Sequence, residues 1–414
     1  MTETKQVKKR RHFTYTDPIL TACVLFLTLF GTIMVLSASI SSKTNIISEV
    51  MSAAVRQVAF LIISYAIYFV IVKFFTFELL NKWILVLLVI EIGMLIVTRA
   101  FGSIGGSYAW IRIGPLSLQP SEFAKVLMVM TIVVFMCDIK TTKVKKAWTI
   151  IRYPVLVFLT FAFLIVVYQH DFGSGFACLA IGAICFLVPS HKLFKPVKIG
   201  ILIIAVLGIV LTALFMTEGF RMWLTSDELR AFMANNAVIG KIWNKVSYQF
   251  YRFLSAGNPL WDRFGYSQEL LNSLLGMSRG NLTGIGLGNS IQKFGYLASA
   301  SADYIFPVIV EELGLIGIAC VFIPYTIMFY RLVKYALLVK SEKEKVVLIG
   351  TFTYFFIHMF LNIGGVSAFI PLTGVPLLLV SRGGSAMMAS LALMGVSQNI
   401  IRKYNYKNDE NNSR

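Results

Sequence analysis

The stretch PILTACVLFLTLFGTIMVLSASI, residues 18–40, decides the fold class of this 414-residue chain. It holds no charged side chain, and its apolar residues are continuous. A membrane β-strand would instead alternate apolar and polar residues. About 20 mostly apolar residues are enough for a helix to cross the hydrocarbon core of a bilayer. The stretch therefore predicts a membrane-spanning helix.

Further stretches of the same kind follow along the chain. Hydrophobic residues make up 57% of the chain and charged residues 14%, whereas soluble domains have roughly 45–50% and about 25%. This composition excludes a soluble enzyme and a disordered chain. We predict an all-α polytopic integral membrane protein of about ten transmembrane helices, at 18–40, 57–73, 83–98, 122–137, 153–168, 174–189, 199–216, 305–330, 346–361 and 377–400.

The net charge of +18 would first suggest a nucleic-acid partner. The basic residues, however, gather at both chain ends and in every second short connection between spans. The other short connections hold only Lys43, Arg56, Arg99 and Arg112. This asymmetry is the positive-inside rule, with both termini cytoplasmic. The excess of basic residues thus indicates the topology and contact with anionic membrane lipids, and not a nucleic-acid partner. The protein is predicted to be a multi-pass protein of the cytoplasmic membrane.

The spans divide the chain into five parts. The predicted parts are a cytoplasmic basic tail (1–17), helices one to seven (18–216), a large extracytoplasmic loop (217–303), helices eight to ten (304–401) and a second cytoplasmic tail (402–414). Within the loop, Phe232, Val238, Ile242, Val246 and Phe250 recur near helical spacing. This spacing predicts amphipathic helices that lie in the membrane interface.

Charged side chains inside spans are energetically costly and therefore suggest functional sites. They are Glu91, Glu122, Lys125, Glu311, Glu312 and Arg382. The spacing i,i+3 places Glu122 and Lys125 on one helix face, where they can pair as a structural or a functional ion pair. For Glu311, a proton relay and a contact that holds helices together both stay open.

Asp303 is the candidate general base. It lies at the outer mouth of span eight, next to Ala302, Tyr304 and Ile305. Partial loss of water raises the pKa of such a carboxylate toward that of a useful base. The alternative is an N-cap, since an acidic side chain that precedes a helix satisfies its free N–H groups.

Two glycine-rich segments lie on the outer side. The first, residues 280–288, is followed by Lys293, so it predicts either a turn whose N–H groups face a phosphate or a plain turn. The second, residues 364–384, predicts a re-entrant segment beside a polar cavity, because helix breakers at membrane depth must be buried in protein or line a cavity. The four histidines and five cysteines suggest no metal or disulfide framework.

Taken together, ordered motifs along nearly the whole chain resemble the SEDS family, the FtsW, RodA and SpoVE group. The residues that carry the resemblance are Met34–Ser39, Trp110–Ile111, Gln119–Lys125, Gln169–Gly173, Asn258–Pro259, Asp262, Gly265–Tyr266, Gly286–Lys293, Asp303–Phe306, Glu311–Gly314, Asn362–Gly364, Pro371–Leu377 and Ser381–Ser385. The string Gly286–Lys293 is more similar to FtsW than to RodA.

The resemblance implies a peptidoglycan glycosyltransferase that polymerises lipid II outside the cytoplasmic membrane with a class B penicillin-binding transpeptidase. The family's essential aspartate matches Asp303. We expect the substrate-binding residues to be Lys293, Arg279, Trp110, Arg112, Glu122, Lys125, Asp171 and Ser385. No cofactor follows from the residues, and a divalent cation, Mg²⁺ or Mn²⁺, is left open. The alternatives are a lipid II flippase and a non-catalytic scaffold that activates a transpeptidase.

The chain departs from the family pattern around these motifs. Residues 298–302 are small where the family has a Pro-Glu-x-His-Thr stretch, and Ala109 replaces an arginine that usually precedes the Trp-Ile pair. His170 replaces a proline and Arg382 a tyrosine. One hypothesis is that Arg112 or Arg382 supplies the displaced positive charge.

Overall fold

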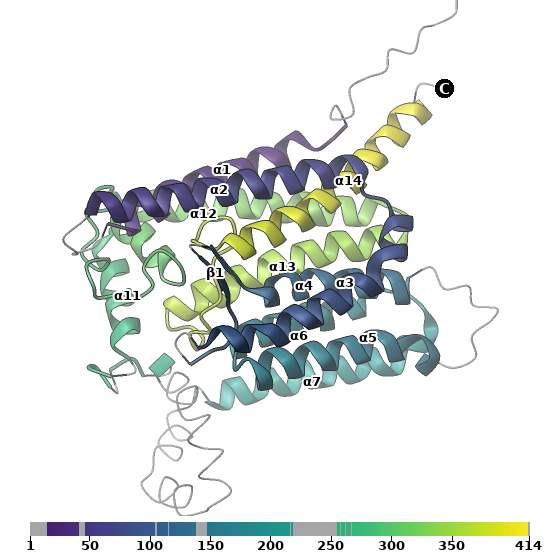
Figure 1. Cartoon of the computed structure of the whole chain (residues 1–414), viewed down its shortest axis with the longest axis horizontal. Coiled ribbons are helices and arrows are strands. Elements are labelled where there is room, and N and C mark those ends of the chain that lie inside the picture. The colour runs from purple at the N-terminus through teal and green to yellow at the C-terminus, as the bar shows by residue number, and fades with distance from the viewer. Residues whose placement is uncertain are drawn as a thin grey trace, which may run out of the picture.

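The computed structural model describes residues 15–40, 46–103, 106–114, 116–137, 147–215, 217, 255–256, 258–260, 262–265 and 267–412. Its long helices lie side by side in one bundle, with α1 and α2 at one edge and α5 and α7 at the opposite edge (Figure 1). Among the described residues the strands form a single antiparallel hairpin of β1 and β2, in which Arg112 pairs with Ser117. The all-α prediction is confirmed.

Each predicted span contains a helix. The helices are α1 Pro18–Ala38, α2 Ile46–Phe74, α3 Phe77–Val97, α4 Pro120–Met136, α5 Ala147–Ala162 with its π-helical continuation η2 Phe163–Tyr168, α6 Phe172–Leu187, α7 Lys195–Phe215, α11 Gln268–Arg279, α12 Ile305–Leu338, α13 Glu342–Val366 and α14 Gly384–Asn412. Short elements are η1 Thr98–Phe101, η3 Lys192–Phe194, β1 Ile111–Ile113 and β2 Leu116–Leu118. By length and composition, seven of the described helices are able to cross a membrane.

Local sequence explains where several helices begin. The Asp17 carboxylate accepts hydrogen bonds from the backbone N–H groups of Ile19 and Leu20. Pro18 follows at the first helical position, where a missing N–H costs nothing. Thr76 caps α3 in the same way by accepting from Leu79 N. The Thr76 cap lets α3 begin only two residues after α2 ends.

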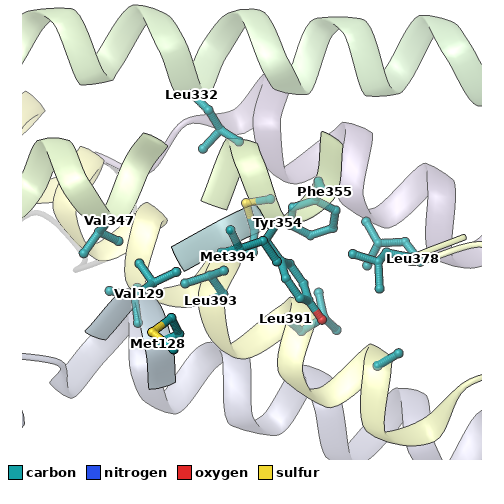
Figure 2. Packing of buried hydrophobic residues seen from close by; sticks show 14 of the residues in the cluster. Met128, Val129, Leu332, Val347, Tyr354, Phe355, Leu378, Leu391, Leu393 and Met394 are labelled. Carbon is teal, nitrogen blue, oxygen red and sulfur yellow. The ribbon is translucent and has the colours of Figure 1, made fainter. Parts of the chain in front are cut away.

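The core of the bundle is formed by α4, α12, α13 and α14. Figure 2 shows Met128 of α4, Tyr354 of α13 and Leu391 of α14 packed together, and all three are buried. Helices α2, α3 and α7 instead expose apolar side chains such as Val89 and Ile204, each 70% exposed. An apolar surface of this kind is suited to face lipid.

Span ten differs from its prediction. Residues 377–383, predicted to open the helix, form an irregular segment, and α14 begins only at Gly384. Leu377 and Val380 are fully buried, Leu379 has φ +63°, and the Val380 backbone lies against Gly31 of α1. The run 377–380 is apolar because it is buried inside the protein, and not because it forms a lipid-facing helix. Since α14 begins only at Gly384, Arg382 precedes the helix, and the prediction that it lies inside a span is wrong.

The C-terminal end of α14 also differs from the prediction. The predicted tail 402–414 is helical to Asn412, because backbone hydrogen bonding continues after the apolar residues end. In the predicted outer loop, residues 232–250, where amphipathic helices were expected, lie outside the described residues. The helix that is described in this loop is α11, and its buried residues are Leu270, Ser273 and Gly276.

The connection between α13 and α14 is the predicted re-entrant segment. Its backbone carbonyls are met by polar side chains from the helices around it: Asn362 Nδ2 donates to Val375 O at 2.9 Å, and the Tyr325 hydroxyl donates to Leu378 O. His358 Nδ1 lies 3.2 Å from Pro376 O. The carbonyl groups of this irregular segment therefore have hydrogen-bond partners within the protein, as backbone inside a bilayer must.

Candidate active site

Asp303 lies at the outer start of α12, and its backbone is firmly held. Asn362 Nδ2 of α13 donates to Asp303 O at 2.8 Å as well as to Val375 O. The side chain is half-buried, and its Oδ2 faces Gly374, where an added Cβ would lie 3.6 Å away. The N-cap position of α12 is Tyr304, one residue after Asp303.

Arg382 lies beside Asp303. Its backbone N–H donates to Ser301 O at 2.8 Å, which joins the end of the re-entrant segment to the residues before α12. The side chain is exposed, yet nearby protein atoms displace enough water to lower the pKa of Arg382. The positive charge of Arg56 lowers this pKa further, whereas the Asp303 carboxylate raises it. Arg382 is thus within electrostatic range of both Arg56 and Asp303.

Three helix N-termini meet next to this group through Gln119, Asp171 and Ser385. Gln119 N donates to Ser385 Oγ at 2.7 Å at the start of α4, and Gln119 Nε2 donates to Asp171 Oδ2 at 2.9 Å. The other carboxylate oxygen of Asp171 accepts from Ser174 N and caps α6. Ser385 is in the first turn of α14 and is buried. The positive ends of three helix dipoles therefore converge here.

Gly173 connects these helix N-termini to Asp303. A Cβ added at Gly173 would lie 2.1 Å from Thr373 O, and Gly374 is the residue that faces the Asp303 carboxylate. The start of α6 thus packs directly against the backbone turn that borders the catalytic candidate.

We predict that Gly173→Ala lowers stability by about 1–3 kcal/mol, the usual cost of overpacking a rigid contact, and also lowers activity, because the Thr373–Gly374 turn must move. Gly200→Ala in α7 is the matched control, since nothing lies within 4 Å of its added Cβ. Thermal unfolding of both variants in detergent measures the difference, and equal melting temperatures would contradict the contact.

The predicted pair of Glu122 and Lys125 is present and fully buried. Lys125 Nζ lies 2.7 Å from Glu122 Oε1 and 3.1 Å from His358 Nε2. The Tyr354 hydroxyl donates to Glu122 Oε2 at 3.2 Å. Because neither charged side chain is exposed, this network supports the site from beneath, through His358 and the Pro376 carbonyl.

Lys293 and Arg279, the two predicted phosphate partners from the outer loop, occupy different environments. Lys293 Nζ is buried and bonded to Glu312 Oε1 at 3.0 Å, Gly288 O at 2.6 Å and Ser37 Oγ at 3.4 Å. The Arg279 side chain is 45% exposed, with Nη1 3.8 Å from Glu311 Oε1. Arg279 is accessible to a substrate, whereas the Lys293 ammonium already donates to three protein acceptors.

The glycine-rich run packs against α12. Ile285 N and Gly286 N donate to the carbonyls of Glu311 and Glu312, each at 3.0 Å, and Leu315 N donates to Leu282 O. Gly314 has φ 58° and ψ −140°, which interrupts α12 at this point. The N–H groups of residues 285 and 286 are thus bonded to protein, and the alternative of a phosphate-facing turn is wrong for them.

Trp110 and Arg112 lie at the hairpin. Trp110 is half-buried just before β1, and Arg112 is exposed within β1. The hairpin contacts the start of the site through β2 and α14.

Sequence reasoning missed two residues that shape this site. Asn362 was noted only as part of a motif, although an amide inside a span signals a backbone that needs a donor. Arg56 was counted only as an outer-loop charge, although it influences Arg382. Among the described residues, no group of three or more His, Cys, Asp or Glu side chains is arranged to hold a metal ion.

The chain is similar to known proteins over nearly its whole length. The family model for the cell cycle proteins FtsW, RodA and SpoVE matches residues 18–406. Stage V sporulation protein E of Bacillus subtilis is 28% identical and covers 94% of this chain and 98% of its own length. A probable peptidoglycan glycosyltransferase FtsW of Buchnera aphidicola subsp. Baizongia pistaciae is 30% identical over 91% of this chain and 92% of the relative.

Solved structures show the same fold. A chain of a peptidoglycan synthase complex that coordinates polymerization and crosslinking aligns with TM-score 0.68 and 20% identity, over 94% of this chain and 98% of that one. The rod shape determining protein RodA of Thermus thermophilus aligns with TM-score 0.61 and 19% identity over the same shares. The chain belongs to the FtsW, RodA and SpoVE family of cell cycle proteins.

Proposed function

We propose that this multi-pass membrane protein is a peptidoglycan glycosyltransferase that polymerises lipid II at the outer face of the cytoplasmic membrane. The observation that carries the proposal is the placement of Asp303. A half-buried carboxylate on a fixed backbone lies beside an exposed guanidinium and close to three helix N-termini. This arrangement combines a base with positive charge, the two requirements of glycosyl transfer from a diphosphate.

In the proposed reaction, a sugar hydroxyl of one lipid-linked disaccharide attacks the anomeric carbon of another. A C–O bond forms, the bond between the anomeric carbon and the diphosphate oxygen breaks, and undecaprenyl diphosphate leaves. The Asp303 carboxylate accepts the hydroxyl proton. The negative charge that develops on the leaving diphosphate is stabilised by Arg382 and by the N-terminus of α14.

The remaining candidates divide by exposure. Arg279 and Arg112 are accessible and are proposed to contact substrate directly. Glu122, Lys125 and Lys293 are buried and paired, so we assign them a positioning role. A divalent cation, Mg²⁺ or Mn²⁺, would be held largely by the substrate phosphates and would supply further positive charge at the leaving group.

The proposed partner is a class B penicillin-binding transpeptidase. The support is the fold similarity to a chain of a peptidoglycan synthase complex, together with the lipid-facing apolar surface on which a partner's membrane helix could pack.

The test is the formation of glycan strands by the purified full chain with its transpeptidase in detergent, with labelled lipid II analysed by gel electrophoresis. A polymerase yields strands. A lipid II flippase and a non-catalytic scaffold yield none, because detergent leaves no bilayer to cross and a scaffold makes no bond. Absence of strands with a folded, partner-bound chain would overturn the proposal.

A further inference from the structure

Arg99, at the outer end of α3, is held between two tyrosine rings. Its guanidinium carbon lies 5.1 Å from the Tyr108 ring centroid and 4.9 Å from that of Tyr168. Distances of this size are typical of cation–π contacts. The two tyrosines come from different segments, one before β1 and one at the end of η2, so the fold assembles this arrangement.

The rings are positioned by bonds that do not use the Arg99 side chain. Gln169 Nε2 donates to Leu95 O and to Thr98 Oγ1, each at 3.0 Å, which fixes the end of η2 on the last turn of α3. Tyr108 N donates to Gln169 O at 2.8 Å, and the Tyr168 hydroxyl donates to Ile96 O at 3.3 Å. The clamp is therefore present before any ligand arrives.

The backbone next to the clamp has an unusual conformation. His170 has φ +58°, which non-glycine residues rarely adopt, and its ring lies 6.2 Å from the Tyr108 ring. His170 therefore continues the series of contacts, which runs from the Tyr168 ring to the Arg99 guanidinium, the Tyr108 ring and the His170 ring. Conformations of this kind cluster at functional sites, where the surrounding structure compensates their cost.

The clamped guanidinium keeps N–H groups that can donate to a ligand. Both rings contact the guanidinium, yet the Arg99 side chain as a whole is exposed. The hydrogen bond described for it is Nη1 to Tyr168 O at 3.4 Å. Within the described part of the chain, no carboxylate lies within ion-pair distance of Arg99. A planar fork that is already oriented matches two oxygens of an oxoanion.

The position of Arg99 along the membrane normal selects the oxoanion. Arg99 is in η1, directly after the end of a spanning helix, and tyrosines gather at the level of lipid headgroups. Phosphate attached directly to a lipid tail lies at this level, whereas the sugar and peptide of a lipid-linked precursor extend farther outward.

We propose that Arg99, clamped between Tyr108 and Tyr168, binds the phosphate group of a lipid-anchored molecule at the outer leaflet. The phosphate has two sources: the polyprenyl diphosphate of the substrate, which rests on the proposed function, or the headgroup of a bilayer phospholipid, which does not. Neither Ala109 nor Arg112 is part of this clamp.

The test compares Arg99→Lys and Arg99→Gln with Arg152→Gln in the full chain. Arg152 is a matched control, because it is also exposed and stacked on a tyrosine, 4.8 Å from the Tyr153 ring, but at the other end of the bundle near the start of α5. Lysine keeps the charge and loses the planar fork, so both Arg99 variants are expected to lose affinity.

The first measurement is the dissociation constant of undecaprenyl diphosphate in phospholipid-free detergent. A loss of roughly tenfold in both Arg99 variants, the size of one charge-assisted contact, assigns the substrate diphosphate. The second measurement is native mass spectrometry of phosphatidylglycerol retained from membranes. A loss confined to this lipid assigns the phospholipid headgroup.

Two results separate failure of the inference from failure of the proposed function. If neither lipid binds less well and only the melting temperature falls, Arg99 is a structural staple and the inference is overturned. If the wild-type chain binds undecaprenyl diphosphate through Arg99 but forms no glycan strands, the inference stands and the proposed function fails.

Discussion

Asp303→Asn is expected to lower the initial rate of lipid II polymerisation by about 10²–10⁴-fold, the contribution typical of a positioned general base. Asparagine has nearly the same shape but cannot accept the hydroxyl proton. The bond from Asn362 to the Asp303 backbone carbonyl is unaffected by the change. The variant should therefore fold and bind lipid II normally, and the loss should appear in the rate and not in the affinity.

The measurement is the appearance of glycan strands with time, together with the lipid II dissociation constant. Asp409→Asn, an exposed aspartate near the cytoplasmic end of α14, is the control and should retain full activity. An Asp303→Asn protein that polymerises at the wild-type rate would move the base to another residue.

Lys293→Met is expected to lower the free energy of unfolding by about 3–5 kcal/mol, because it leaves a buried carboxylate without its charged partner. Glu312 is fully buried and accepts from Lys293 Nζ at 3.0 Å. Methionine preserves most of the side-chain volume but removes the charge. The effect should appear as a lower melting temperature and as loss of the monodisperse peak in detergent.

The double variant Lys293→Met with Glu312→Gln should recover much of this loss, since no isolated charge remains buried. Lys340→Met removes an exposed lysine and serves as the control. If the single and double variants are as stable as the wild type, the pair of Lys293 and Glu312 does not stabilise the fold. Lys293 would then again be a candidate phosphate partner.

The bundle could be predicted because hydropathy reports directly on helix-length apolar runs. The same signal misplaced the start of the last helix. Leu377 and Val380 are as apolar as lipid-facing residues, but α1 and the other surrounding helices enclose them. Composition alone does not distinguish a side chain that faces lipid from one that faces protein, so the irregular segment before Gly384 required the structure.

In the candidate site, too, some contacts could be predicted from the sequence and others could not. The pair of Glu122 and Lys125 was predictable because both residues share one helix turn. The contacts of Asp303 with Asn362 and Gly374 join positions about 60 to 70 residues apart, as does the clamp around Arg99, and no local pattern encodes such contacts. The glycine-rich run gave a clear signal for special backbone, but its partner, Gly314 of α12, was not visible from the run itself.

The break in α12 has a mechanical consequence. At Gly314 the helix's own ladder is replaced by bonds to residues 282–286, so the outer turns of α12 form one block with the extracytoplasmic loop and the inner turns form another with the bundle. Because Asn362 of α13 and the Arg382 N–H bond the carbonyls of Asp303 and Ser301, the start of α12 joins this loop to α13 and to the segment before α14.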